Sequence, residues 1–245
     1  MDNLWLNKSN NLRRKEASVH NDKRCERHDL QQLFWECTLR CNLNCLHCGS
    51  DCRATSDMQD MPLEDFLVVL DDVRSTMDPG RILVITTGGE PLVRKDICNC
   101  GRAIKERGFH WGMVSNGMLL NEKMCAQLID AGLETIAISL DGFEDAHNWL
   151  RGSKNSFALA VKAIRILVDT TITWDVITCV NQRNIEYIDS FKQYLIDIGV
   201  QDWRVFTIVP MGRATTNEEL QLSEDQFHCL MDFIVKVRKE GKIHL

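Results

Sequence analysis

The sequence predicts an α/β fold, a partial (β/α)6 TIM-like barrel in which all strands are parallel. Two observations support it: short strand-like runs alternate with helical stretches from Leu33 onward, and six such units follow one another. Strands that alternate with helices imply parallel pairing and right-handed crossovers. Six units are too few for a closed eight-stranded barrel, and a flat doubly wound sheet is the alternative. In both folds, chemistry collects at the carboxyl ends of the strands.

Each predicted strand is a short apolar run that precedes a loop. Because successive runs are separated by a helix, they cannot pair as hairpins. The predicted strands are 33–38, 82–86, 111–115, 135–140, 173–180 and 203–208.

The predicted helices have recognisable ends. Pro62 is expected in the opening turn of the first helix. Ser223 with Gln226 fits a capping box that opens the last helix, where Phe227, Leu230, Ile234 and Val237 recur at helical spacing. Three glycines follow helical patterns, as a left-handed cap requires: Gly108, Gly132 and Gly199.

The 245 residues divide into a polar N-terminal leader at 1–30, a core domain at 31–240, and a segment at 241–245 that looks like the start of a truncated C-terminal extension. A formal charge of −6 argues against a general nucleic-acid or anionic-membrane binder. Neither a signal-peptide core nor a membrane-length apolar run is present. We therefore expect a cytoplasmic protein with reduced thiols.

Cysteines are concentrated in one loop. The chain has 11 cysteines, and Cys41, Cys45 and Cys48 follow the first strand with the spacing C-x3-C-x2-C. Such close spacing lets one loop wrap a cubane, with one thiolate for each of three irons. The fourth iron then stays open, as in catalytic rather than structural metal centres. These residues predict an iron-sulfur enzyme.

A zinc site is the structural alternative. It would use Cys37 with the three loop cysteines, or would include Cys52. Zinc sites generally combine two close ligands with a second pair further away, and no such pair follows. We therefore interpret Cys37 as a buried or cluster-adjacent thiol, and Cys52 as a spare or neighbouring one.

The remaining strand ends resemble, in order, those of the radical S-adenosylmethionine superfamily. The glycine-glycine-glutamate segment follows the second predicted strand, and the further segments follow the later strands. The resemblance covers about residues 33 to 215, and its segments are 87–92, 114–117, 138–142, Asn181 and 209–214.

The resemblance implies a 4Fe-4S cluster, S-adenosyl-L-methionine, and reductive cleavage to a 5'-deoxyadenosyl radical that abstracts hydrogen from a substrate. Arg151 matches an arginine that pairs with the carboxylate of the cofactor. Ser139 matches a residue that contacts the polar groups of the cofactor near the ribose. His47 departs from the aromatic residue often found there. The implied cofactor-binding residues are Gly88, Gly89, Glu90, Ser115, Asn116, Ser139, Asp141 and Arg151.

Three segments of the sequence look most like the SPASM-type branch: 48–50, 139–142 and 210–214. Many members of that branch modify peptides or proteins, as the sulfatase-maturing enzymes do. This implies a reductant such as flavodoxin or ferredoxin, and a peptide, protein or small-molecule substrate. No residue is predicted to exchange hydrogen with the substrate. Two non-catalytic alternatives remain, an electron-transfer or redox-sensing module and a zinc-binding interaction domain; the first would usually have four cysteine ligands.

Overall fold

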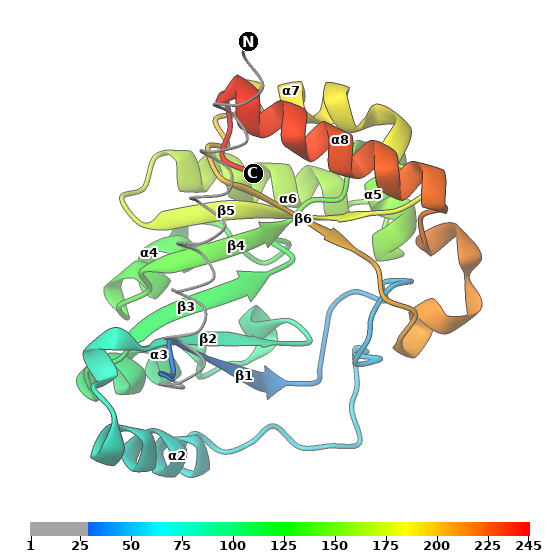
Figure 1. The fold of residues 1–245 in the computed structure, drawn as a ribbon. Helices are drawn as coiled ribbons and strands as arrows, with labels where there is room; N and C mark the ends of the chain where they lie inside the picture. Colours follow the sequence, from blue (N-terminus) through cyan, green and yellow to red (C-terminus); the bar gives the residue numbers. More distant parts are fainter. Residues whose placement is uncertain (1–28) are drawn as a thin grey trace. The chain divides into compact units, whose positions relative to one another are not determined.

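Six parallel strands form a single sheet in the computed structural model, which describes residues 29–245 (Figure 1). They lie side by side in chain order, β1 to β6. A doubly wound sheet reverses its strand order at a switch point, so the flat alternative is wrong and the partial barrel is confirmed. The strands are β1 Gln32–Thr38, β2 Leu83–Gly88, β3 His110–Ser115, β4 Thr135–Ser139, β5 Thr173–Val180 and β6 Trp203–Thr207.

A helix follows every strand. The α-helices are α2 Leu63–Thr76, α3 Ile97–Glu106, α4 Glu122–Asp130, α5 Glu144–Arg151, α6 Ser156–Val168, α7 Ile188–Asp197 and α8 Glu224–Glu240. Short 3-10 helices occupy several loops: η1 Pro79–Arg81, η2 Pro91–Val93, η3 Ile185–Tyr187, η4 Gly212–Thr216 and η5 Glu218–Leu220.

Most of the predicted helix ends are confirmed. The three predicted cap glycines all have positive φ, and Ser223 and Gln226 form the predicted capping box. Pro62 lies one residue earlier than predicted, at the N-cap of α2. The predicted stripe of α8 is wrong at one end, since Phe227 is exposed while Phe233 packs on Trp203 in the core.

The helices cover one face of the sheet. Trp35 of β1 stacks on Phe66 of α2, with ring centroids 3.9 Å apart. At the opposite edge, Trp203 of β6 packs edge-on against Phe191 of α7, at 6.1 Å. Large aromatic side chains on alternate strand positions therefore build the core between sheet and helices.

The other face of the sheet is the inner face of the partial barrel. Because side chains alternate along a strand, residues an odd number of positions from the buried Trp35 and Trp203 point to this inner face. Phe34 is 59% exposed and Phe206 is 47% exposed, although both belong to the sheet. The inner face thus combines apolar side chains with access from solvent.

The chain divides into two compact units, Met1–Gln31 and Gln32–Leu245. The predicted leader at 1–30 lies almost wholly outside the described residues. At the other end, His244 forms a single parallel bridge with Asp202 rather than the start of a strand. In residues 29–245, no helix is both long and apolar enough to span a bilayer.

Candidate active site

The three predicted iron ligands lie in the loop between β1 and α2, residues 39–61, which we call the cysteine loop. Arg40 pairs with Arg53 in a parallel bridge, and the amide of Cys41 donates to the carbonyl of Arg53 at 2.7 Å. These bonds close an inner ring that contains all three thiols. Cys41 and Cys45 are buried, and Cys48 is half-buried.

A second tie holds the outer ends of the same loop. Arg94 is 4% exposed, and its Nη1 donates to the carbonyls of Cys37 at 2.7 Å and Met61 at 2.9 Å. Asp96 pairs with the same guanidinium at 2.8 Å. One arginine therefore joins the end of β1 to the start of α2.

Backbone amides point at two of the thiols. The amide of Leu43 lies 3.4 Å from Sγ of Cys41, and that of Cys52 lies 3.4 Å from Sγ of Cys48. Amide donors stabilise the thiolate form and tune the potential of an iron-sulfur cluster. The loop backbone thus suits anionic sulfur.

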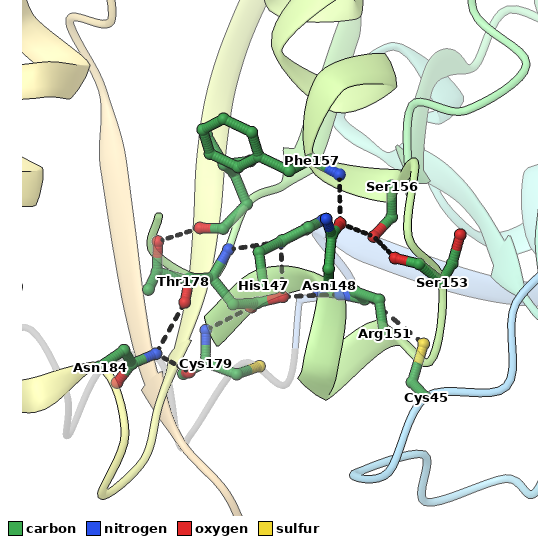
Figure 2. A network of polar contacts seen from close by, with 12 residues as sticks. Cys45, His147, Asn148, Arg151, Ser153, Ser156, Phe157, Thr178, Cys179 and Asn184 are labelled. Atoms are coloured by element: carbon green, nitrogen blue, oxygen red, sulfur yellow. Dashed lines mark hydrogen bonds and ion pairs between the residues drawn. The ribbon is translucent and has the colours of Figure 1, made fainter. Parts of the chain in front are cut away.

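Two more donors come from side chains further along the chain, one just after β3 and one in the last turn of α5. Nδ2 of Asn116 lies 3.9 Å from Sγ of Cys41, and Nη1 of Arg151 lies 3.9 Å from Sγ of Cys45. Figure 2 shows Arg151 directed toward Cys45. Each ligand thiol therefore has at least one N–H group directed at it.

Burial raises the pKa of the Cys41 thiol to about 11 and also raises the pKa of Cys45. A thiol binds metal as the thiolate, so loading this site releases protons. The compensating charge would come from iron, with Arg151 beside it.

A single-ion zinc site lacks support from the donor geometry. Among the residues that the structure describes, no three His, Cys, Asp or Glu side chains are arranged to hold one metal ion. A cubane needs its thiolates further apart, one at each iron. Cys52 packs with Cys41 and Cys45, whereas Cys37 is fully buried elsewhere and burial raises its pKa to about 12.

Gly88 and Gly89 bring the end of β2 against the base of the cysteine loop. A Cβ at Gly88 would overlap the carbonyl oxygen of Thr38, and one at Gly89 would overlap that of Arg40. The amide of Gly89 donates to the carbonyl of Thr38 at 2.7 Å. Both glycines are required by this close approach of two backbones.

Glu90 is a buried corner between the ends of β2 and β3. Its carboxylate accepts hydrogen bonds from the amide of Leu92 at 3.1 Å, the hydroxyl of Ser115 at 2.9 Å and the amide of Asn116 at 2.7 Å. Burial raises the pKa of Glu90, against the opposing effect of these donors. The carboxylate therefore fixes the loops that follow β2 and β3.

Ser115 and Asn116 extend this corner toward the thiols. The hydroxyl of Ser115 also accepts from the amide of Gly117, at 3.0 Å. Nδ2 of Asn116 donates to Oδ1 of Asn42 in the cysteine loop, at 2.8 Å. The end of the third strand therefore holds Asn42, the residue that directly follows Cys41 in the cysteine loop.

Asp141, just after β4, and Arg151, in the last turn of α5, form a buried ion pair. Nε of Arg151 donates to Oδ2 of Asp141 at 2.6 Å, and the amide of Cys179 donates to Oδ1 at 2.9 Å. Burial opposes the charged form of Asp141 most strongly, but Arg151 and the neighbouring His147 together outweigh it and hold the pKa of Asp141 well below its usual range. Asp141 in turn raises the pKa of Arg151 although burial lowers it.

His147 and Asn184 complete this network. Nδ1 of His147 accepts from the amide of Asp141 at 3.0 Å, and burial lowers the pKa of the imidazole. Nδ2 of Asn184 donates to the carbonyls of Asp141 at 2.8 Å and Cys179 at 2.9 Å. The ends of β4 and β5 are joined through these polar groups, and His147, to which the sequence assigned no role, belongs to this network.

Two predicted residues present unused polar atoms. Within residues 29–245, the hydroxyl of Ser139 has no hydrogen-bond partner, and the side chain is only 9% exposed at the end of β4. Nδ1 of His47 is buried without a partner among the same residues, and burial lowers the pKa of His47 to about 4. Buried polar atoms normally have partners, so Nδ1 of His47 fits a bound polar group, and the hydroxyl of Ser139 is free to bind one.

Arg213, in the loop after β6, was not predicted to have a role. Its Nε donates to the carbonyl of Cys45 at 2.7 Å, and its amide donates to the carbonyl of Cys48 at 3.0 Å. Residues 209–214 were recognised as a family-like segment, but Arg213 and Cys45 are too far apart in sequence for any local pattern to join them.

Comparison with known proteins agrees with this geometry. The family model described as the radical SAM superfamily matches residues 35–195. The AdoMet-dependent heme synthase of Methanosarcina barkeri is 28% identical over 214 residues, covering 87% of this chain and 60% of that protein. The Fe-coproporphyrin III synthase of the same organism is 27% identical, over 79% of this chain and 48% of that protein.

Solved structures show the same fold. Streptococcus suis SuiB bound to S-adenosylmethionine matches with a TM-score of 0.69 and 16% identity, covering 92% of this chain and 52% of that one. The protein anSMEcpe with bound AdoMet matches with a TM-score of 0.70 and 17% identity, over 88% of this chain and 63% of that one. The chain thus spans only about half to three fifths of the relatives it matches.

Proposed function

Because the chain belongs to the radical SAM superfamily, we propose that it is an enzyme that binds a 4Fe-4S cluster and S-adenosylmethionine, the cofactors of that family. Cys41, Cys45 and Cys48 would hold three irons. A reduced cluster with this cofactor supplies one-electron cleavage of the sulfonium, giving methionine and a 5'-deoxyadenosyl radical that removes hydrogen from the substrate.

The observation that carries this proposal is the set of N–H donors directed at the three thiols, with Arg151 among them. Nη1 of Arg151 faces Cys45, while Nε is used by Asp141. Nη2 has no hydrogen bond to the described residues, which leaves it for a carboxylate. A methionine carboxylate beside Cys45 would meet a cation that is already oriented.

The predicted cofactor-binding residues separate into two groups on this proposal. Ser139, Arg151 and the backbone of Gly88 and Gly89 would contact the cofactor directly, and Asn116 would act at the Cys41 sulfur. The rest act as positioning residues, because their side-chain oxygens already bind within the protein: Glu90, Ser115 and Asp141.

For the substrate, we propose a peptide or protein. The exposed apolar inner face, with Phe34 and Phe206, suits side chains of an extended segment. SuiB and anSMEcpe, which share the fold, have been solved with a precursor peptide and with a Cp18Cys peptide. The sequence resemblance to heme synthases favours an iron porphyrin as second candidate. If titration with the protein shifts the visible absorption of an iron porphyrin, and peptides show no binding, the substrate is the porphyrin.

The decisive experiment is anaerobic reconstitution with iron and sulfide, followed by dithionite and S-adenosylmethionine. We expect release of 5'-deoxyadenosine, and a protein reductant such as flavodoxin or ferredoxin should replace dithionite. Cys45→Ala should abolish both the visible absorbance and the release, whereas Cys229→Ala, at an exposed position of α8, should change neither. Nucleoside release by Cys45→Ala would overturn the ligand assignment.

The same experiment separates the alternatives. Colour without nucleoside release would identify an electron-transfer or redox-sensing module, and a colourless, zinc-loaded protein an interaction domain. Arg151→Lys should keep its iron but bind S-adenosylmethionine about tenfold or more weakly, because an ammonium lacks the planar fork. Equilibrium dialysis of both proteins measures this difference.

A further inference from the structure

The two edge strands of the partial barrel are joined through the cysteine loop. β1 and β6 lie at opposite edges of the sheet and do not pair. Nevertheless, the segment after β6 contacts the loop after β1, as the orange and blue segments at the open side of Figure 1 illustrate. The loop that carries the thiols is therefore held from both edges.

Arg213 makes four contacts with that loop. Its amide and its Nε bind the carbonyls of Cys48 and Cys45, at 3.0 and 2.7 Å. Its Nη1 donates to the carbonyl of Cys52 at 3.0 Å and to Oδ1 of Asp51 at 2.7 Å. One residue thus fixes the backbone of two ligand cysteines and of the cysteine that follows them.

Gly212 allows this approach. Its φ is +55°, and a Cβ there would lie 2.5 Å from the carbonyl oxygen of Cys48 and closer still to that of Gly49. Both a left-handed backbone and the absence of a side chain are needed. Any larger residue would push the turn that carries Cys48 away.

We propose that Gly212 and Arg213 form a positioning clasp that holds Cys45 and Cys48 in the geometry that binds the cluster. This rests on the proposed function only in requiring a cluster at these thiols. Since three of the four contacts go to carbonyls along the turn from Cys45 to Cys52, the clasp fixes the turn itself. It acts on retention of iron, before S-adenosylmethionine or substrate is bound.

The first test is Arg213→Lys in the full chain, reconstituted anaerobically. A single ammonium cannot replace a fork that reaches two carbonyls and a carboxylate. Disruption of the three charge-assisted bonds of this side chain should speed iron release to a ferrous chelator by about tenfold or more. Arg183→Lys is the matched control, because Arg183 pairs with Glu219 and stacks on Trp149 without touching the cysteine loop.

The second test changes no charge. Gly212→Ala should also speed iron release, by steric displacement of the Cys48 turn. Its control is Gly241→Ala, because Gly241 has a similar φ of +64° but no atom within 4 Å of the added Cβ. The control measures backbone strain alone. Visible circular dichroism of each loaded protein reports the geometry around the iron.

The expected result is fast iron release and altered visible dichroism in Arg213→Lys and Gly212→Ala, with both controls like wild type. Release rates equal to wild type in both clasp variants would overturn the proposal. Fast release accompanied by an equal fall in melting temperature in clasp and control variants would also overturn it, since that indicates general destabilisation. A wild-type protein that binds no iron would instead refute the proposed function.

Discussion

Glu90 follows β2 and Asp141 follows β4, and both carboxylates are buried at the carboxyl ends of the parallel strands. Their partners nevertheless differ. Neutral donors surround Glu90: two amides and a hydroxyl. Asp141 faces the guanidinium of Arg151 as well as an amide. Consequently burial prevails at Glu90 and raises its pKa, whereas at Asp141 burial is outweighed by Arg151 and the neighbouring His147 together, which lower its pKa.

The difference indicates two kinds of corner in one site. The Glu90 corner joins two loops, and burial disfavours the charged form of its carboxylate. A rigid backbone tolerates this cost. The Asp141 corner keeps a cation next to Cys45 and fixes the orientation of its guanidinium. Only the second corner places a full charge beside a ligand sulfur, so the two should respond differently to substitution and to pH.

The largest effect is expected from Asp141→Asn. This change leaves the Arg151 cation buried without its anion, and breaking a buried pair costs about 3–5 kcal/mol. Urea unfolding measures the loss. The control is Asp175→Asn, whose partner Arg204 is half exposed, so that its effect should stay within about 1 kcal/mol. Equal losses in the two variants would contradict the assignment of a special pair at Asp141.

Glu90→Gln should cost less, about 1–3 kcal/mol. The glutamine amide keeps one acceptor oxygen. Its NH2 group would face a group that now donates to Glu90, either the N–H of Asn116 or the donors at the other oxygen. Glu36→Gln is the control, because Glu36 is exposed and, within residues 29–245, its side chain accepts only from the hydroxyl of Ser50. If Glu90→Gln were as harmful as Asp141→Asn, the comparison between the corners would fail.

Opposite pH dependences should distinguish the two carboxylates. Asp141, with a lowered pKa, stabilises the folded state above the ordinary Asp pKa of about 3.9, and this stability is lost as pH falls further. Glu90, with a raised pKa, disfavours the folded state as pH rises above about 4.3. The wild-type unfolding free energy minus that of Asp141→Asn should therefore fall on acidification, and the difference from Glu90→Gln should rise. Urea unfolding from pH 7 to 3 tests both signs.

Ser139→Ala should have the smallest effect on stability, within about 0.5 kcal/mol, since its hydroxyl binds none of the described residues. Affinity for S-adenosylmethionine should nevertheless fall, by up to about tenfold for one lost hydrogen bond. Equilibrium dialysis gives the affinity. A strongly destabilised protein with normal affinity would show that Ser139 belongs to the core and not to the cofactor site.

Local patterns predicted most of the fold. The six strands, the three glycine caps and the capping box depend on neighbouring residues, and the sequence displays these directly. Strand order decides between barrel and flat sheet, and it depends on contacts between distant segments. Alternation of strands and helices therefore left both folds open.

The site was predicted residue by residue but not pair by pair. Asp141 and Arg151 were both expected at the cofactor, yet Nε of Arg151 donates to Oδ2 of Asp141, and the other carboxylate oxygen accepts from the amide of Cys179. Gly88 and Gly89 were expected to admit the cofactor, and packing against the cysteine loop also requires them. The role of Arg213 was not predicted, because Arg213 follows one edge strand and its partners lie in the loop after the other.

The double fastening of the cysteine loop bears on how such proteins can diverge. The Arg40 to Arg53 bridge closes the inner ring, and Arg94 joins the outer ends, so residues 54–59 run outside the ring as a largely exposed stretch. Lengthening a flexible segment adds little closure entropy. Insertions in that stretch should thus be inherited without disturbing the thiols, making it the place where new surface features can be added at small cost.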